Sequence, residues 1–116
     1  MADLDPTPFD RIALALALAR AVAWESVLGS PSLTIQGPAQ QVYGVEAPTT
    51  WDAIEARVHP DDRPCHRGRR EQAARTGGYT AMFRVVRPDT GVIVWIEERA
   101  RVDGGRLVGA ARVGER

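Results

Sequence analysis

The last third of the chain alternates apolar and polar residues in the pattern of β-strands. Residues 79–87 and 92–102 alternate in this way, and the segment PDTG between them is a typical turn sequence. A second turn, DGGR, leads into residues 106–113, and its two glycines suit a two-residue hairpin. The pattern therefore predicts a three-stranded antiparallel meander.

The alternation also assigns side chains to the two faces of this meander, because successive strand residues point to opposite sides. One face carries Ala81, Phe83, Val85, Val94, Ile96, Glu98, Ala100, Leu107, Gly109, Ala111 and Val113. The other carries Met82, Arg84, Val86, Ile93, Trp95, Glu97 and Arg99. Arg84 is predicted to lie across from Trp95 as a cation–π pair. The apolar residues of this second face need a cover, and the N-terminal helix is the candidate.

That helix is predicted although Leu and Ala alternate with period two at positions 14–18. Ala forms helices well and strands poorly. Leu14, Leu18 and Val22 fall on one side of the helix, opposite a second apolar stripe, and a helix that is apolar on two sides must be buried on two sides. We therefore expect residues 1–22 to form a flanking helix. Leu14, Leu18 and Val22 should contact a second copy of the chain or a partner helix.

Shorter elements are predicted between this helix and the meander. Residues 24–28 and 33–36 have the composition of short strands bounded by Gly and Pro. A single helical turn should end at Gly44. A short helix follows in the segment TTWDAIEARV, where Thr49 and Asp52 have the spacing of a capping box.

The segment HPDDRPCH, residues 59–66, introduces the longest helix of the domain. Pro60 biases His59 toward extended backbone and so separates this helix from the preceding one. Asp61 or Asp62 can cap the first amides and complement the helix dipole. The helix should run to Gly77, since glycine adopts the left-handed conformation that ends helices.

The same segment contains residue types that bind metals and move protons. Its spacings match no established Cys/His zinc pattern. Cys65 and His66 are adjacent, and adjacent helical side chains point about 100° apart, so they do not form a nucleophile and its base. We therefore interpret the segment as a helix entry, with no metal site and no catalytic residue, and Cys65 as a small buried core residue.

Glu98 is the most informative residue of the inner face, because a buried carboxylate needs a partner. The long helix is expected to face inward near Arg69 and Gln72, and one of these should be that partner. The candidate ligand pocket therefore consists of Cys65, Arg69, Gln72, Phe83, Ile96, Glu98 and Ala111. Alternatively, the sheet edge or a β-bulge exposes Glu98 to solvent, since a one-residue slip reverses every face.

Composition excludes several functional classes. The 116 residues suffice for one domain, and 44% of them are hydrophobic. Fifteen basic and fifteen acidic residues give zero net charge, which argues against nucleic acid or acidic membranes as partners. The longest apolar run, residues 12–19, is too short to span a bilayer. The single cysteine cannot form an internal disulfide, which fits a cytoplasmic protein.

The order of elements and several local phrases resemble a PAS domain, in the subgroup of the PAS fold with the pattern HPDDR…G…W. The matching pieces are Trp24, VYG at 42–44, HPDDR at 59–63, FRVVRPDTG at 83–91, Trp95 and Gly109. The resemblance implies an α+β fold in residues 23–116, preceded by the flanking helix 1–22. Its sheet would have five antiparallel strands in the order 2-1-5-4-3, with helices on one face.

The resemblance further implies a non-catalytic sensory module of bacterial two-component signalling. Such a module binds a small ligand in its core, mediates homodimer contacts, or does both, and signals to a partner such as a histidine kinase or cyclase. One alternative is a ligand-free PAS dimerisation scaffold with a filled core. Another is a small α+β enzyme that uses Glu98. The DIT-like motif that ends many PAS domains is absent, so we expect either a stand-alone module or a piece of a longer protein.

Neither haem nor flavin is expected, and the identity of any cofactor stays open. Haem-binding PAS domains take an axial histidine from the long helix, but the corresponding position falls on Arg67, one residue after His66. A one-residue slip turns a helical side chain by about a quarter turn. Light-sensing members place a cysteine in an NCRFLQ-like helix before the position of HPDDR, whereas Cys65 lies after it.

Overall fold

A five-stranded antiparallel sheet organises the chain. The computed structural model describes residues 8–46, 48–88 and 90–114. The strands are β1 (Ala21–Val27), β2 (Thr34–Gln36), β3 (Gly78–Val86), β4 (Ile93–Asp103) and β5 (Arg106–Val113). Their order in the sheet is β2-β1-β5-β4-β3, which confirms the predicted architecture.

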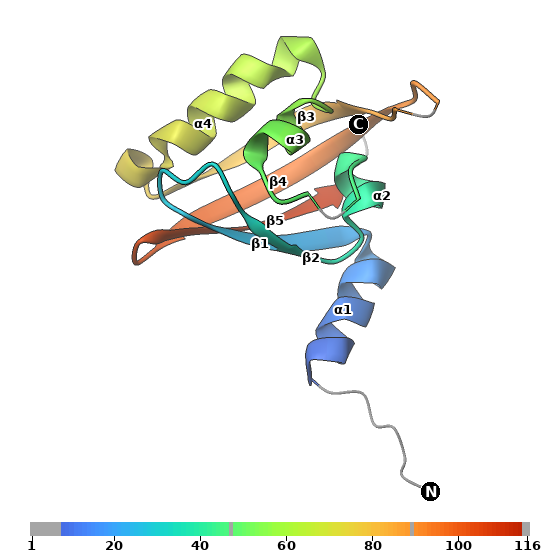
Figure 1. Cartoon of the computed structure of the whole chain (residues 1–116), viewed down its shortest axis with the longest axis horizontal. Helices are drawn as coiled ribbons and strands as arrows, with labels where there is room; N and C mark the ends of the chain where they lie inside the picture. The colour runs from blue at the N-terminus through green and yellow to red at the C-terminus, as the bar shows by residue number, and fades with distance from the viewer. Residues whose placement is uncertain (1–7, 47, 89, 115–116) are drawn as a thin grey trace, which may run out of the picture.

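The helices divide into one group that covers the sheet and one helix that leaves it. They are α1 (Pro8–Ala19), α2 (Ala39–Tyr43), α3 (Trp51–Glu55), the short 3₁₀ helix η1 (Pro60–Asp62) and α4 (Arg63–Thr76). Figure 1 shows α2, α3 and α4 on one side of the sheet, whereas α1 extends from the start of β1 in the other direction. The core therefore lies between the sheet and α2–α4.

The predicted faces of the meander are confirmed by the register. Glu98 in β4 pairs with Ala81 in β3 and with Ala111 in β5, and all three are buried. On the opposite face, Arg84 pairs with Trp95, and its guanidinium carbon lies 5.5 Å from the centre of the indole ring. Alternation thus located both faces because no bulge interrupts these strands.

Two tryptophans pack against each other in the core. The Trp24 and Trp51 rings meet edge to face, with centroids 4.7 Å apart. Trp24 is paired with Gly109 of β5, and a Cβ atom at Gly109 would lie 2.3 Å from the Trp24 ring. The glycine is therefore required by the close approach of the indole rather than by its own backbone angle.

The N-terminal helix is shorter than expected. It ends at Ala19, Arg20 adopts a left-handed φ of 51°, and β1 starts at Ala21. Val22 is consequently a fully buried strand residue opposite Ala111, so the prediction that it lies on the dimer face of a helix is wrong. The strand prevails here because pairing with β5 satisfies its backbone groups and buries its side chain.

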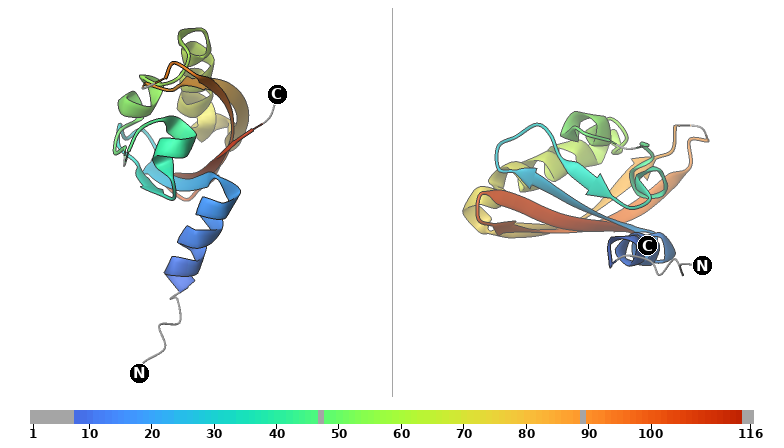
Figure 2. Two further views of the ribbon diagram at one scale, coloured as in Figure 1. Left: turned by 90° about the vertical axis from the view of Figure 1, so that its right-hand side faces the viewer. Right: turned by 60° about the horizontal axis from the view of Figure 1, so that its bottom comes forward.

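The expectation that this helix covers the outer face of the sheet is also wrong. The left view of Figure 2 shows α1 leading away from the sheet. Ile93 keeps 50% of its surface exposed. Because the chain enters β1 directly from Arg20, α1 is attached at the end of the sheet and does not fold back across it.

The caps of two helices also differ from the predictions. Thr50 rather than Thr49 caps α3, accepting a hydrogen bond from the Ala53 amide at 3.2 Å. At the HPDDR segment, the His59 ring accepts from the Asp61 amide at 3.1 Å, and the Asp62 side chain caps nothing. The intervening 3₁₀ turn directs Asp62 to β3 instead.

Candidate functional site: a buried charge cluster between the helices and the sheet

Glu98 is the innermost member of a cluster of buried charged residues. Its side chain is fully buried in β4. One carboxylate oxygen accepts a hydrogen bond from the Tyr43 hydroxyl of α2. The other accepts from the Tyr79 hydroxyl at 2.6 Å and lies 3.0 Å from Nε2 of His66. Three groups from three different elements therefore satisfy this carboxylate.

His66 connects Glu98 to a second buried carboxylate. The imidazole is inaccessible to solvent and packs against the Phe83 ring, with centroids 4.6 Å apart. Nδ1 lies 3.7 Å from a carboxylate oxygen of Glu55, an ion-pair distance that is too long for a hydrogen bond. The ring thus lies between two carboxylates, one on each side.

Glu55, the last residue of α3, is held by two arginines of α4. Arg67 donates to one oxygen from Nε and Nη2, at 3.0 and 2.8 Å. Arg70 donates to the other oxygen at 2.7 Å, and its guanidinium carbon lies 4.7 Å from the centre of the Trp51 ring. Alternating charges therefore run from the surface of α4 through Glu55 and His66 to Glu98 in the sheet.

The charges in this cluster stabilise one another. Burial alone would disfavour the imidazolium, but Glu98 and Glu55 outweigh it and raise the pKa of His66 to about 9. Burial opposes ionisation of Glu55 as well, yet His66, Arg67 and Arg70 lower its pKa to about 2. Burial opposes ionisation of Glu98 too, but the attraction of His66 outweighs it, so the pKa of Glu98 is lowered. The cluster is therefore ionised at neutral pH.

The two tyrosines act as hydrogen-bond donors to this anion. Burial and the neighbouring Glu98 charge raise the pKa of both Tyr43 and Tyr79 above the usual value. Both hydroxyls consequently keep their protons and point them at the carboxylate. Charge-assisted hydrogen bonds of this kind are stronger than neutral ones.

The predicted ligand-pocket residues fall into two separate groups. Phe83, Ile96, Glu98 and Ala111 are buried together on the inner face. Cys65, Arg69 and Gln72 are exposed on another flank of α4. Arg69 donates to the Cys65 sulfur at 3.4 Å and to the Thr80 carbonyl at 2.9 Å.

The expected partners of Glu98 and the interpretation of Cys65 as buried are therefore wrong. The error lies in the rotation of α4, which turns His66 and Ala73 inward. Cys65 and Gln72 each precede one of these inward residues and so point about a quarter turn away.

The sequence analysis did not predict the other members of the cluster, which are Tyr43, Glu55, His66, Arg67, Arg70 and Tyr79. Tyr79 could have been predicted, because it is an even number of residues from Ala81 and Phe83 in the same strand and so points to the same face. The spacing of seven between His66 and Ala73 is a helical spacing, but it does not by itself say which stripe faces the sheet. Tyr43 and Glu55 lie in short helices whose orientation only the tertiary structure defines.

This arrangement holds charge but offers no open position for a reactant at Glu98. In the parts of the chain that the structure describes, no three His, Cys, Asp or Glu side chains group to hold a metal ion. Arg67, the position that the resemblance relates to a haem ligand, binds Glu55 instead.

The comparisons with known proteins agree with the fold. The sequence matches the family described as PAS fold over residues 33–109, and the chain belongs to this family. A search of curated proteins gave no match. Among the residues described, no helix is long and apolar enough to cross a membrane.

Three of the solved structures with similar folds come from proteins named as histidine kinases or as a diguanylate cyclase. One is a sensory box histidine kinase/response regulator from Burkholderia thailandensis, with a TM-score of 0.63 and 23% identity over 89% of this chain and 83% of that one. A second is the N-terminal domain of a diguanylate cyclase with a PAS/PAC sensor from Marinobacter aquaeolei, with a TM-score of 0.67 and 22% identity over 80% and 94%. A third is a domain of a light and redox sensing histidine kinase, described as a candidate, from Haloarcula marismortui, with a TM-score of 0.65 and 16% identity over 90% and 98%.

Proposed function

We propose that the chain is a non-catalytic sensory module of a bacterial signalling pathway, and that it acts through protein–protein contacts. The observation that carries this proposal is the complete satisfaction of Glu98 by Tyr43, Tyr79 and His66. A ligand placed against Glu98 would have to break a buried ion pair. This favours the alternative in which the core is filled over the one in which it holds a ligand.

The same contacts argue against an enzyme based on Glu98. A general acid or base must come within hydrogen-bond reach of its substrate. Glu98 is fully buried, and both of its oxygens are engaged by protein groups. We therefore assign it a role in holding the sheet to α2 and α4.

We further propose that α1 mediates a homodimer in the cytoplasm. Leu14 and Leu18 are 59% and 79% exposed, although both are large apolar residues. Burying a leucine side chain contributes about 1.5–3 kcal/mol, so an interface that covers both from each copy is favourable. The similar solved structures are named as histidine kinases and a diguanylate cyclase, which supports a kinase or a cyclase as the output partner.

The dimer is tested with the double variant Leu14→Glu/Leu18→Glu, analysed by size-exclusion chromatography with light scattering. We expect the parent chain to be a dimer and the variant a folded monomer, because two charges per copy would have to be buried without partners. The control variant Gln72→Glu/Val92→Glu adds the same charges at exposed positions elsewhere and should remain a dimer. A monomeric parent, or a dimer that survives the α1 changes, would reject this interface.

A further inference from the structure

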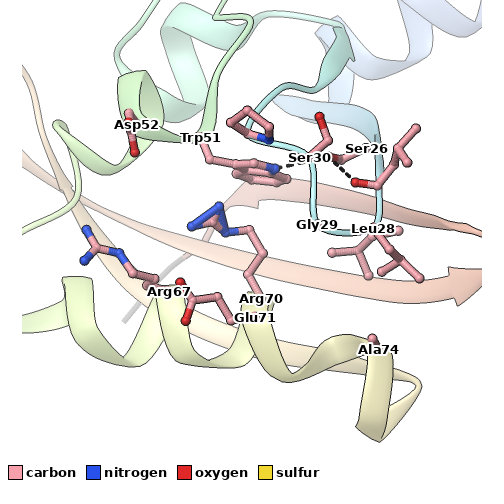
Figure 3. A pocket seen from close by; sticks show the side chains of 13 residues that line it. Ser26, Leu28, Gly29, Ser30, Trp51, Asp52, Arg67, Arg70, Glu71 and Ala74 are labelled. Carbon is pink, nitrogen blue, oxygen red and sulfur yellow. Dashed lines mark hydrogen bonds between the residues drawn. The ribbon is translucent and has the colours of Figure 1, made fainter.

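A cavity of about 490 Å³ lies at the edge of the core, between the β1–β2 loop, α3 and α4. Figure 3 shows it from close by, with Arg70 rising from α4 toward Trp51, and Leu28 across from Ala74. Leu28, Leu107 and Ala74 give it an apolar part, and the two arginines give it a cationic part. Its volume falls within the range of small-molecule sites, which commonly combine apolar walls with a few polar groups.

Arg70 is fixed in place and keeps an unused donor. Its side chain is 14% exposed, stacks on Trp51 and gives Nη2 to Glu55. Its Nε is buried and has no hydrogen-bond partner among the described residues. A buried donor without a partner is costly, and Arg70 itself lines the cavity.

Arg67 and Arg70 are the cations that line the cavity, and Arg70 is the less exposed of the two, at 14% against 53% for Arg67. Arg67 and Arg70 share the single carboxylate of Glu55, while His66 and Glu98 neutralise each other. Two further carboxylates, Asp52 and Glu71, also line the cavity, and both attract Arg67. Both are exposed residues whose charge is screened by water and salt. An incoming anion is therefore favoured at the deeper Arg70 rather than at the rim.

We propose that this cavity binds a small organic carboxylate that carries an apolar chain or ring. The carboxylate is placed against Arg70 and Arg67, because the guanidinium fork matches the geometry of a carboxylate. The apolar part lies against Leu28, Leu107 and Ala74. The arginine end of the cavity thus binds the carboxylate of the ligand, and the apolar end binds its chain or ring.

Occupancy would also reach the core. A bound carboxylate would share Arg67 and Arg70 with Glu55, and Glu55 in turn lies beside His66. Binding therefore perturbs the charges that join α3 and α4 to the sheet. This site is independent of the function proposed above, since a contact module with a filled core can exist with or without it.

The test is a titration of the full chain with hexanoate and, separately, phenylacetate, followed by two-dimensional ¹H–¹⁵N NMR. Hexanamide and phenylacetamide serve as neutral probes of the same shape. We expect saturable shifts at residues around the cavity with the acids, and at least about tenfold weaker binding of the amides because a charge-assisted contact is lost.

Two variants and one control identify the site. Ala74→Trp fills the apolar part at an exposed position of α4 without removing a charge, and Arg67→Gln removes one cation; each should weaken acid binding by about tenfold or more. Gln72→Trp places the same ring on another flank of α4 and should leave binding unchanged. No saturable shift with either acid, equal binding of acids and amides, or full binding by Ala74→Trp would overturn the proposal.

Discussion

At the scale of single residues, the buried charges are the unusual feature of this domain. Glu55, His66 and Glu98 are all buried. Taking such charges out of water costs several kcal/mol each unless partners compensate for it. Here each charge has an opposite charge beside it, and the two tyrosines complete the environment of Glu98. Removing one partner should therefore lower the free energy of unfolding by more than the loss of a single surface ion pair would.

Replacing Glu98 by Gln should lower the free energy of unfolding by about 3 kcal/mol, because His66 then loses a buried counter-ion. Urea unfolding followed by tryptophan fluorescence measures this. The matched control is Glu97→Gln, one residue along β4 on the other face, where the carboxylate pairs with Arg99 and Arg112 near the surface. The control should lose less than about 1 kcal/mol. Equal losses in the two variants would show that the cluster contributes no more than a surface pair.

The cluster also predicts how stability depends on pH. The pKa of His66 is about 9 in the folded protein and 6.5 is its usual value, so the folded state binds the proton more tightly. This contribution is complete below pH 6.5 and is lost as the pH rises through about 9. Glu55 has the opposite sign, because its pKa is lowered from 4.5 to about 2 and its contribution is lost as the pH falls through that range.

Unfolding free energies measured from pH 6 to pH 9.5, a range chosen to bracket the pKa of His66 at about 9, should therefore decrease steadily in the parent chain. The variant His66→Gln should be less stable at pH 6 and show a flatter profile, so that the difference from the parent shrinks toward pH 9.5. Tyr43 and Tyr79 do not titrate in this range, since their pKa values are raised above the usual one. A parent profile as flat as that of the variant would mean that His66 is not a buried cation.

At the scale of elements, one aspartate attaches the start of α4 to the sheet. The Asp62 carboxylate accepts from the Arg84 backbone amide at 2.8 Å and from the Arg84 guanidinium at 3.0 and 2.8 Å. These bonds to Arg84 hold the pKa of Asp62 below its usual value. The turn before α4 and the middle of β3 are thereby held together.

Asp62→Ala should lower the free energy of unfolding by about 1–2 kcal/mol, because the Arg84 amide and guanidinium lose their acceptor and both groups are only partly screened by water. The adjacent Asp61→Ala is the control. Its side chain is 78% exposed, and its carboxylate lies 3.9 Å from Nδ1 of His59, which accepts a hydrogen bond from the Asp61 amide. Chemical denaturation of both variants measures the difference. An Asp61 variant as unstable as the Asp62 variant would mean that the lost stability comes from helix capping rather than from the bonds to Arg84.

At the scale of the whole molecule, the domain presents two surfaces beyond its core. One is α1, which projects from the sheet with Leu14 and Leu18 exposed (Figure 2). The other is the cavity between the β1–β2 loop and α4 (Figure 3). The charged cluster connects the cavity to β4, a central strand of the sheet. An input at the cavity and an output at α1 would thus lie at opposite ends of β1.

The sequence by itself determined the meander and its two faces, whereas the burial of Glu98 stayed open until the structure showed it fully buried. Strand alternation has a fixed period of two and the turns are short, so parity carries through from residue 79 to residue 113. Local phrases also sufficed for the resemblance to the PAS fold, which the family match confirms. These features are local or follow from neighbouring strands.

Only the tertiary structure decided which stripe of α4 faces inward, where α1 ends and what surrounds Glu98. Helix rotation depends on packing against a sheet far away in sequence, and an error of one residue replaces His66 with Cys65. Val22 joins β1 because β5 supplies its pairing partner. The Glu98 cluster joins residues from α2, α3, α4, β3 and β4. No local sequence pattern predicts that these residues meet, since buried charges are stable only when all partners are present together.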